Sequence, residues 1–163
     1  MKKWNVNGVS VVLEMGHDDD SDLDLALKTE NIPLGLTPGG VVGGAGTIGG
    51  FGISVKESSQ ADTVVYWPAV SIQNPDRRDI INRAAVEALE EAEEQDLKSV
   101  GFFTMGFEVS RVPSWEVADA LVKAVVNHLK ENSSLQTILL VASSPMQLSS
   151  LEFALNNHWS LDA

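Results

Sequence analysis

The second half of the chain alternates strand-like and helix-like segments, and this alternation limits the fold more than any other feature. Strands are predicted at 63–67, 99–105 and 137–142, where apolar residues follow one another with few interruptions. Nearly continuous apolar strands are typical of parallel sheets that are covered on both faces. Because right-handed crossovers connect such strands, the pattern predicts an α/β fold with helices on both faces of a largely parallel sheet.

Three amphipathic helices are predicted in this half. The first has Asn74 as its N-cap and Pro75 at its first helical position, and it runs to about Gln95. The second is capped by Ser114 and runs to about 130, and the third opens at 144–145 and ends near 156. Their apolar positions recur every three or four residues and are expected to face the core. These positions are Ile80, Ile81, Ala84, Ala85, Ala88, Leu89 and Ala92; Val117, Ala118, Leu121, Val122, Val125 and Leu129; and Leu148, Leu151, Phe153, Ala154 and Leu155. The acidic cluster Glu90, Glu91, Glu93 and Glu94 is interpreted as a solvated face.

The first half contributes shorter strands. They are predicted at Val6–Glu14, at Leu23–Leu27 with its three leucines on one face, and at 51–55. No linker or repeat divides the chain, and 163 residues suffice for one core. We therefore predict a single domain over residues 1–163.

Composition and charge exclude several classes of function. The chain carries a formal charge of −12 and no cysteine, so disulfides and thiolate chemistry are excluded and nucleic-acid binding is not expected. The N-terminus lacks the apolar core of a signal peptide, and no apolar run approaches the roughly 20 residues of a membrane span. We expect a soluble, cytoplasmic protein without a membrane partner. The oligomeric state is left open.

A glycine-rich stretch, residues 35–52, holds 9 of the 13 glycines. Glycine lets the backbone approach a ligand closely, and bare backbone N–H groups bind phosphate well. The alternative interpretation is a flexible surface loop. The stretch lacks the lysine of a nucleotide-hydrolysing phosphate loop, and no convincing helix follows it to complete a dinucleotide-binding fingerprint.

Other polar residues give weaker evidence for a metal site or a catalytic site. Alternating carboxylates at Asp18, Asp20, Asp22 and Asp24 suggest a calcium site, but the required glycine and closing glutamate are missing, so we predict an acidic turn and no metal. The three histidines are scattered, and no nucleophile elbow occurs. No catalytic residue and no cofactor are predicted. Core or rim packing is the expected role of Trp67 and Trp115.

Several local strings resemble one known family. Gly16, followed by His17 and Asp18, stands where that family has a Gly-Asp turn, and Asp24 fits the aspartate that opens its second strand. The segment 28–31 occupies its Asn-Ala-Ala-Asn position, and Gly39-Gly40-Val41-Val42-Gly43 resembles its phosphate loop. Together with the order of elements, these strings resemble a macro domain, the ADP-ribose-binding module, along nearly the whole chain. The resemblance implies a three-layer α/β/α sandwich with a mixed, largely parallel central sheet.

The resemblance also implies a ligand site for ADP-ribose or a related nucleotide diphosphate. Asp18 would contact adenine and Asn31 a ribose hydroxyl or a water, although Asn31 is equally well explained as a turn residue. The remaining residues belong to two loops, the first cradling phosphate and the second following the strand at 99–105. They are Gly39, Gly40, Val41, Val42, Gly43 and Gly44 in the first, and Gly106, Phe107, Glu108, Val109 and Ser110 in the second.

The chain also departs from the family pattern. Lys28 replaces the first asparagine, Val42 stands where hydrolase branches carry an acid, and the second loop lacks both of its usual glycines. Three functions remain open: a non-catalytic binder, which we expect; a diverged domain with a structural or interaction role; and an ADP-ribosyl hydrolase.

Overall fold

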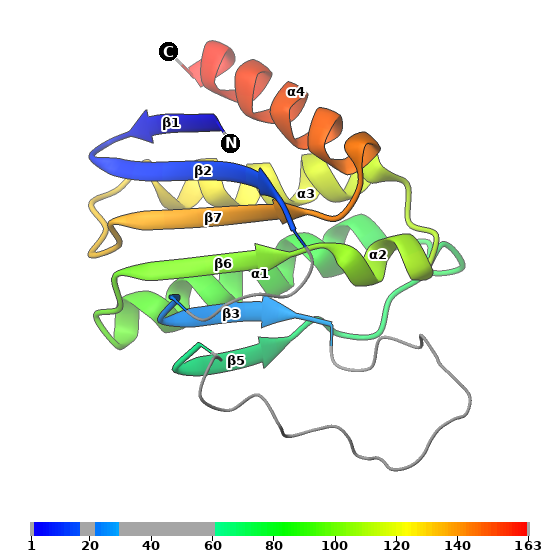
Figure 1. Ribbon diagram of the computed structural model, residues 1–163, viewed down its shortest axis with the longest axis horizontal. Helices are drawn as coiled ribbons and strands as arrows, with labels where there is room; N and C mark the ends of the chain where they lie inside the picture. The colour runs from blue at the N-terminus through cyan, green and yellow to red at the C-terminus, as the bar shows by residue number, and fades with distance from the viewer. Residues whose placement is uncertain (1, 17–21, 30–60, 163) are drawn as a thin grey trace.

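The computed structural model describes residues 2–16, 22–29 and 61–162. The described residues form one six-stranded sheet in the order β1-β2-β7-β6-β3-β5 (Figure 1). β1 pairs antiparallel with β2, and every other neighbouring pair is parallel. The strands are β1 (Lys2–Val6), β2 (Val9–Met15), β3 (Leu25–Lys28), β5 (Thr63–Tyr66), β6 (Ser99–Phe103) and β7 (Thr137–Ala142). The predicted mixed, largely parallel sheet is confirmed.

The strand predicted at Val6–Glu14 covers the last residue of β1, a tight turn and most of β2, and the two strands form a hairpin. Asn7 and Gly8 form its turn, with φ angles of 53° and 88°. Two consecutive residues with positive φ match the right-handed twist of an antiparallel pair, and Asn-Gly is the dipeptide that adopts this turn most readily. The prediction placed both residues inside one strand and missed β1, although the turn signal is present in the sequence.

Four helices lie in the described part of the chain: α1 (Arg77–Glu94), α2 (Met105–Val109), α3 (Ser114–His128) and α4 (Pro145–Asp162). The three long helices share one face of the sheet, where α3 packs between α1 and α4 (Figure 1). The crossovers from β5 to β6 and from β6 to β7 move across the sheet in the same direction. Right-handed crossovers that move in one direction place their helices on one face, so these helices do not divide between the two faces as predicted.

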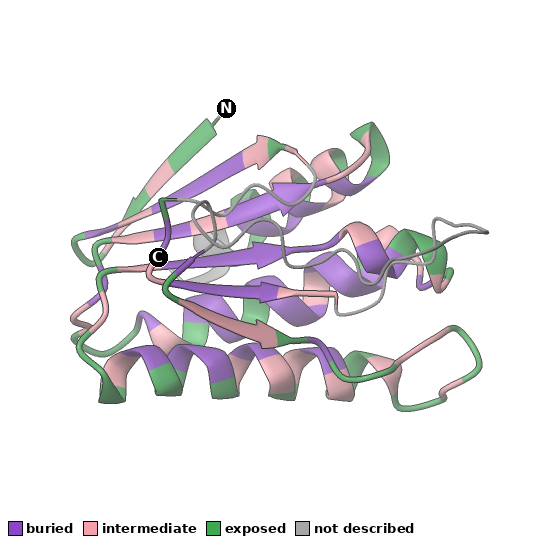
Figure 2. Cartoon of the chain, turned by 60° about the horizontal axis from the view of Figure 1, so that its bottom comes forward, coloured by how far each residue is buried: buried purple, intermediate pink, exposed green. Residues whose placement is uncertain are grey.

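The main core lies between the sheet and these three helices. Its strand residues are completely buried, and the buried stripes of α1 and α3 face them (Figure 2). The predicted stripes are buried or half-buried with one exception, because Phe153 on α4 is 69% exposed. A smaller apolar cluster on the opposite face contains Leu23, Ala26, Ala61, Phe103 and Val141. Leu23 therefore does not share a face with Leu25 and Leu27, as the simple alternation predicted, because it precedes the regular strand.

The helix ends differ from prediction by a few residues. α1 begins at Arg77 with Asp76 as its N-cap, while the Asn74 side chain instead accepts a 2.8 Å hydrogen bond from the backbone N–H of Ser71. Pro113 is the N-cap of α3, so Ser114 is its first residue. α4 continues past the predicted end. None of the helices in the described ranges has the length and apolar character needed to cross a membrane.

Candidate functional site

The carboxyl ends of the five parallel strands meet at one edge of the sheet, from which α1, α3 and α4 begin (Figure 1). In open α/β sheets, ligands bind in the crevice outside this edge. We call this region the carboxyl edge. Its described residues are those directly after or at the ends of the strands: Gly16, Lys28, Thr29, 104–110 and 142–144.

The predicted second loop is a short helix, α2, with its C-cap. Gly106, Phe107, Glu108 and Val109 lie in α2, and Ser110 is its C-cap. Gly106 and Phe107 are buried, whereas Glu108 and Val109 are exposed. The Phe107 ring meets Trp67 edge to face, with 4.9 Å between ring centroids. The side chain of Phe107 therefore packs in the core. In this helix, Glu108 and Val109 are the residues whose side chains are exposed.

Gly106 allows α2 to approach the end of β3. A Cβ atom added at Gly106 would lie 1.9 Å from the Thr29 Oγ1 and 2.6 Å from the Thr29 Cβ. Thr29 is β-branched and cannot swing these atoms away easily. The two residues thus set how closely the segment after β3 and the segment after β6 approach each other at the carboxyl edge.

A buried polar network joins the ends of β6 and β7 to α4. Thr104 and Gln147 are 1% and 2% exposed. The Thr104 hydroxyl donates to the Gln147 Oε1 (2.8 Å), and the Gln147 amide donates back to the Thr104 carbonyl oxygen (2.9 Å). The same Oε1 accepts from the backbone N–H of Ser143 at 2.8 Å. Every group named here has a partner, which buried polar groups require. Sequence reasoning missed this network, since a glutamine in the first turn of a helix carries no signal of burial.

Trp67, which directly follows β5, lies beside the end of β6. The Trp67 indole N–H donates to the Phe103 carbonyl oxygen at 2.9 Å, and its ring is buried. This confirms core packing for Trp67. On the other side of the sheet, the Lys28 ammonium lies 5.6 Å from the centre of the Phe103 ring, within cation–π range.

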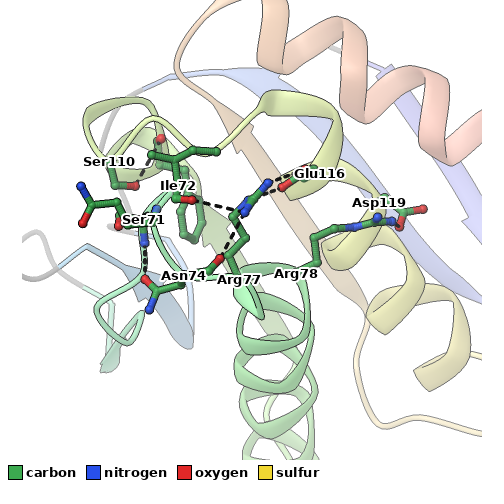
Figure 3. Close-up of polar contacts among 10 residues, drawn as sticks. Ser71, Ile72, Asn74, Arg77, Arg78, Ser110, Glu116 and Asp119 are labelled. Carbon is green, nitrogen blue, oxygen red and sulfur yellow. Dashed lines mark hydrogen bonds and ion pairs between the residues drawn. The ribbon is translucent and has the colours of Figure 1, made fainter.

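Ion pairs occupy the beginning of α1 and α3, which also lie at this edge (Figure 3). The Arg77 guanidinium donates to both carboxylate oxygens of Glu116, at 2.6 and 3.0 Å. Arg78 pairs with Asp119 and lies 5.0 Å from the ring centre of the exposed Trp115. Burial raises the pKa of Asp119, but the hydrogen bonds and charges of Arg78 and Lys123 outweigh it and lower that pKa overall. Both arginines are thereby engaged within the protein.

The other predicted site residues fall outside the described residues. Asp18, Asn31 and the segment 39–44 are among them, so their roles stay predictions. Asp24, which belongs to the acidic run, accepts hydrogen bonds from the backbone N–H groups of Lys98 and Ser99, at 2.8 and 3.2 Å. It joins the beginnings of β3 and β6, at the edge opposite the candidate site. No group of three acidic or histidine side chains within the described ranges is arranged to hold a metal ion.

The described part of the chain has two surface cavities. One of about 580 Å³ lies between α1 and the strand β5, and it includes Tyr66 and Arg83. The other, of about 430 Å³, lies between α3 and α4 and is lined by Trp115, Asp119 and Phe153. Neither contains a predicted ligand-binding residue.

No protein-family model and no curated protein matches this sequence. Solved structures do match it. A macrodomain of Oceanobacillus iheyensis with ADP has 16% sequence identity and a TM-score of 0.71, covering 98% of this chain and 97% of that one. A variant of that macrodomain with ADPR has 17% identity and a TM-score of 0.69, covering 98% of both chains. A Trypanosoma brucei macrodomain in complex with ADP has 16% identity and a TM-score of 0.61, covering 88% of this chain and 68% of that one. Strand order, helix placement and this end-to-end likeness agree: the chain is a divergent example of the macrodomain fold.

Proposed function

We propose that this protein binds ADP-ribose or a related nucleotide diphosphate at the carboxyl edge. One observation carries the proposal. In the sequence, the glycine-rich stretch comes after β3, whose last residue lies at this edge, and the fold of the chain matches, over nearly its whole length, macrodomains solved with ADP and ADPR. Residues 39–44 would supply backbone N–H groups to the phosphates.

We propose binding without catalysis. An ADP-ribosyl hydrolase needs a positioned acid or base, and the position that carries it in the hydrolase branches is Val42 here. Among the described residues that follow the strand ends, Glu108 is the carboxylate, and it lies exposed on α2. Neither side chain supports proton transfer to a bound ribose.

Isothermal titration with ADP-ribose tests the proposal. We expect saturable heat with a dissociation constant of about 1–100 µM, equivalent to roughly −8 to −5 kcal/mol. Gly40→Val should weaken binding at least about tenfold, because a branched side chain would stand where backbone approaches phosphate. The matched control is Gly49→Val, the same substitution outside the predicted phosphate-binding residues, which should bind like the wild type.

Absence of heat and of any thermal shift at millimolar ADP-ribose would contradict the proposal. That result would favour the diverged domain with a structural or interaction role. Equal losses in Gly40→Val and Gly49→Val would contradict the assignment of the phosphate contact to residues 39–44, while leaving binding itself intact. We do not expect nucleic acid to compete, because the net charge of −12 repels a polyanion.

A further inference from the structure

Two exposed aromatic side chains line the cavity between α3 and α4. Trp115, in the first turn of α3, is 58% exposed, and Phe153 of α4 is 69% exposed. Both line the surface cavity of about 430 Å³ that lies between these helices. We call this cavity the α3–α4 groove. Large aromatic side chains that stay exposed beside a cavity are typical of a surface that binds a partner.

The exposed apolar surface continues along α4. Met146 is 70% exposed and precedes Phe153 by seven residues, which is about two helical turns. The lining residues Ser149 and Ser150 lie between them on the same face of the helix. Two turns correspond to about 10 Å along the helix axis. A docked amphipathic helix presents its apolar anchors at i, i+3 or i+4, and i+7, which span the same length.

Asp119 is the carboxylate that lines the groove, and two cations surround it. It pairs with Arg78 and with Lys123, whose ammonium lies 3.3 Å from the Asp119 Oδ2 (Figure 3). The rest of the lining is uncharged. One carboxylate between two cations leaves the groove with a positive charge. Because salt at about 0.1 M screens charges beyond about 10 Å, this local charge outweighs the mean field of the chain for a group bound in the groove.

The wider face of α3 and α4 has the same balance of charge. Residues 114–128 and 145–157, the part of these helices whose side chains the structure describes, include three carboxylates, and each is ion-paired. The pairs are Arg77–Glu116, Arg78–Asp119, Lys123–Asp119 and Lys2–Glu152. Four cations therefore face three carboxylates, although the whole chain carries a formal charge of −12. Within these ranges, no unpaired carboxylate repels an acidic partner.

The Trp115 ring is restrained before a partner arrives. The Arg78 guanidinium lies 5.0 Å from the ring centre, within cation–π range, and its ion pair with Asp119 holds the guanidinium in place. Side chains that are already restrained cost less conformational entropy on binding. Trp and Arg are also the residue types that contribute most often to binding hot spots.

We propose that the α3–α4 groove docks an acidic amphipathic helix of a partner protein. The apolar anchors of that helix cover Trp115, Phe153 and Met146, and a carboxylate beside them faces Arg78 and Lys123. The apolar contacts supply most of the affinity, and the charges select against basic helices. Docking at this groove does not depend on ligand binding at the carboxyl edge, since none of the residues proposed for that ligand lines it.

Peptide display on the full chain tests the docking proposal. Random peptides about 16 residues long, enough for four helical turns, are selected on the wild type and counter-selected on Phe153→Gln. We expect the retained sequences to carry apolar residues spaced by three, four and seven positions, together with a net negative charge. A retained peptide is then titrated against the wild type and each variant by fluorescence anisotropy.

Trp115→Gln and Phe153→Gln should each weaken binding of the retained peptide about tenfold or more, since aromatic anchors dominate such interfaces. Lys123→Glu should weaken it about threefold or more, because a charge that faces the peptide carboxylate is reversed. The matched controls are Tyr66→Gln, at an exposed aromatic residue of β5, and Lys98→Glu, at an exposed lysine before β6. Neither control should change binding. Every substituted side chain is exposed, so all variants should unfold at the urea concentration of the wild type.

Retained peptides with a net positive charge, no enrichment over Phe153→Gln, or equal losses in the control variants overturn the proposal. Sedimentation of the wild type as a dimer that Phe153→Gln dissociates assigns the groove to a second copy of the chain, and this result also overturns it. So does co-sedimentation with phosphatidylserine vesicles that is lost in Trp115→Gln, because it assigns the groove to a membrane surface.

Discussion

At the scale of single residues, the packing at the carboxyl edge requires side chains that are either small or hydrogen-bonded within the protein. Gly106 is the clearest case, because it lies inside a helix where alanine would normally be favoured by about 1 kcal/mol. The Thr29 Oγ1 lies 1.9 Å from the position that an alanine Cβ would take. The collision outweighs the propensity, since the Thr29 Cβ is itself attached to backbone and cannot move alone.

We therefore predict that Gly106→Ala lowers the free energy of unfolding by about 1–3 kcal/mol, the usual cost of overpacking. Urea unfolding measures the change. Thr29→Gly removes all the colliding atoms, so adding it to Gly106→Ala should recover part of the loss in a double-mutant cycle. Gly106→Ala as stable as the wild type would show that α2 does not pack against the end of β3.

At the scale of elements, Glu93 joins the end of α1 to the segment between α3 and β7. The sequence placed it in a solvated acidic cluster, and this prediction was wrong for Glu93. Its carboxylate accepts hydrogen bonds from the Ser133 hydroxyl and from the backbone N–H of Ser134 (3.0 Å), and it lies 2.7 Å from the His128 Nε2. Burial raises the pKa of Glu93, but the hydrogen bonds from Ser133, Ser134 and His128 together lower it to about 2.

We predict that Glu93→Gln lowers the free energy of unfolding by about 1–3 kcal/mol at neutral pH, because charge-assisted hydrogen bonds are lost. A lowered pKa in the folded state stabilises the protein above the ordinary carboxyl pKa of 4.5. This contribution is lost as the pH falls from about 4.5 through about 2.

The difference between the wild type and Glu93→Gln should therefore shrink over that pH range, as measured by urea unfolding at several pH values. Glu94→Gln is the matched control, because Glu94 is the exposed neighbour on the same helix. It should change stability by less than about 0.5 kcal/mol. A difference for Glu93→Gln that does not vary with pH would contradict the role of the ionised carboxylate.

At the scale of the whole molecule, the first and last elements pack together. The Trp4 indole N–H on β1 donates to the Asn156 Oδ1 on α4 at 3.0 Å, and the Lys2 ammonium lies 2.7 Å from the Glu152 Oε2. One main core connects β2, β7, β6 and β3 to all three long helices. Contacts between distant ends and a shared core favour a single cooperative unit.

We predict one unfolding transition for the chain. Tryptophan fluorescence, to which the buried Trp67 and the half-buried Trp4 contribute, and far-ultraviolet circular dichroism should give coincident urea curves. Two separated transitions would contradict the prediction of one domain over residues 1–163.

Much of the fold was predictable because its elements carry strong local patterns. The stripe of α3 and the apolar run of β7 agree with the structure, since burial on one side leaves a periodic pattern of apolar residues and burial on both faces of a sheet leaves a continuous one. Phe153 was predicted to be buried and is not, because a position on a helix can match the apolar period and still face outward. The candidate site was less predictable: the buried Thr104 and Gln147 carry no signal in the sequence, and the role of the glycine-rich stretch stays a prediction.

The α/β class, the largely parallel sheet and most core residues could be read from the sequence, because they depend on periodicity and on composition along short segments. The tertiary structure was needed to establish which strands are neighbours, that α1, α3 and α4 share one face, and that Lys28 lies beside Phe103. It also decided that Glu93, one of four similar glutamates, is the one that holds two elements together. The reason is physical: local patterns record how much of a residue is buried, whereas partners separated by 35 to 75 residues meet only when the crossovers have set the strand order.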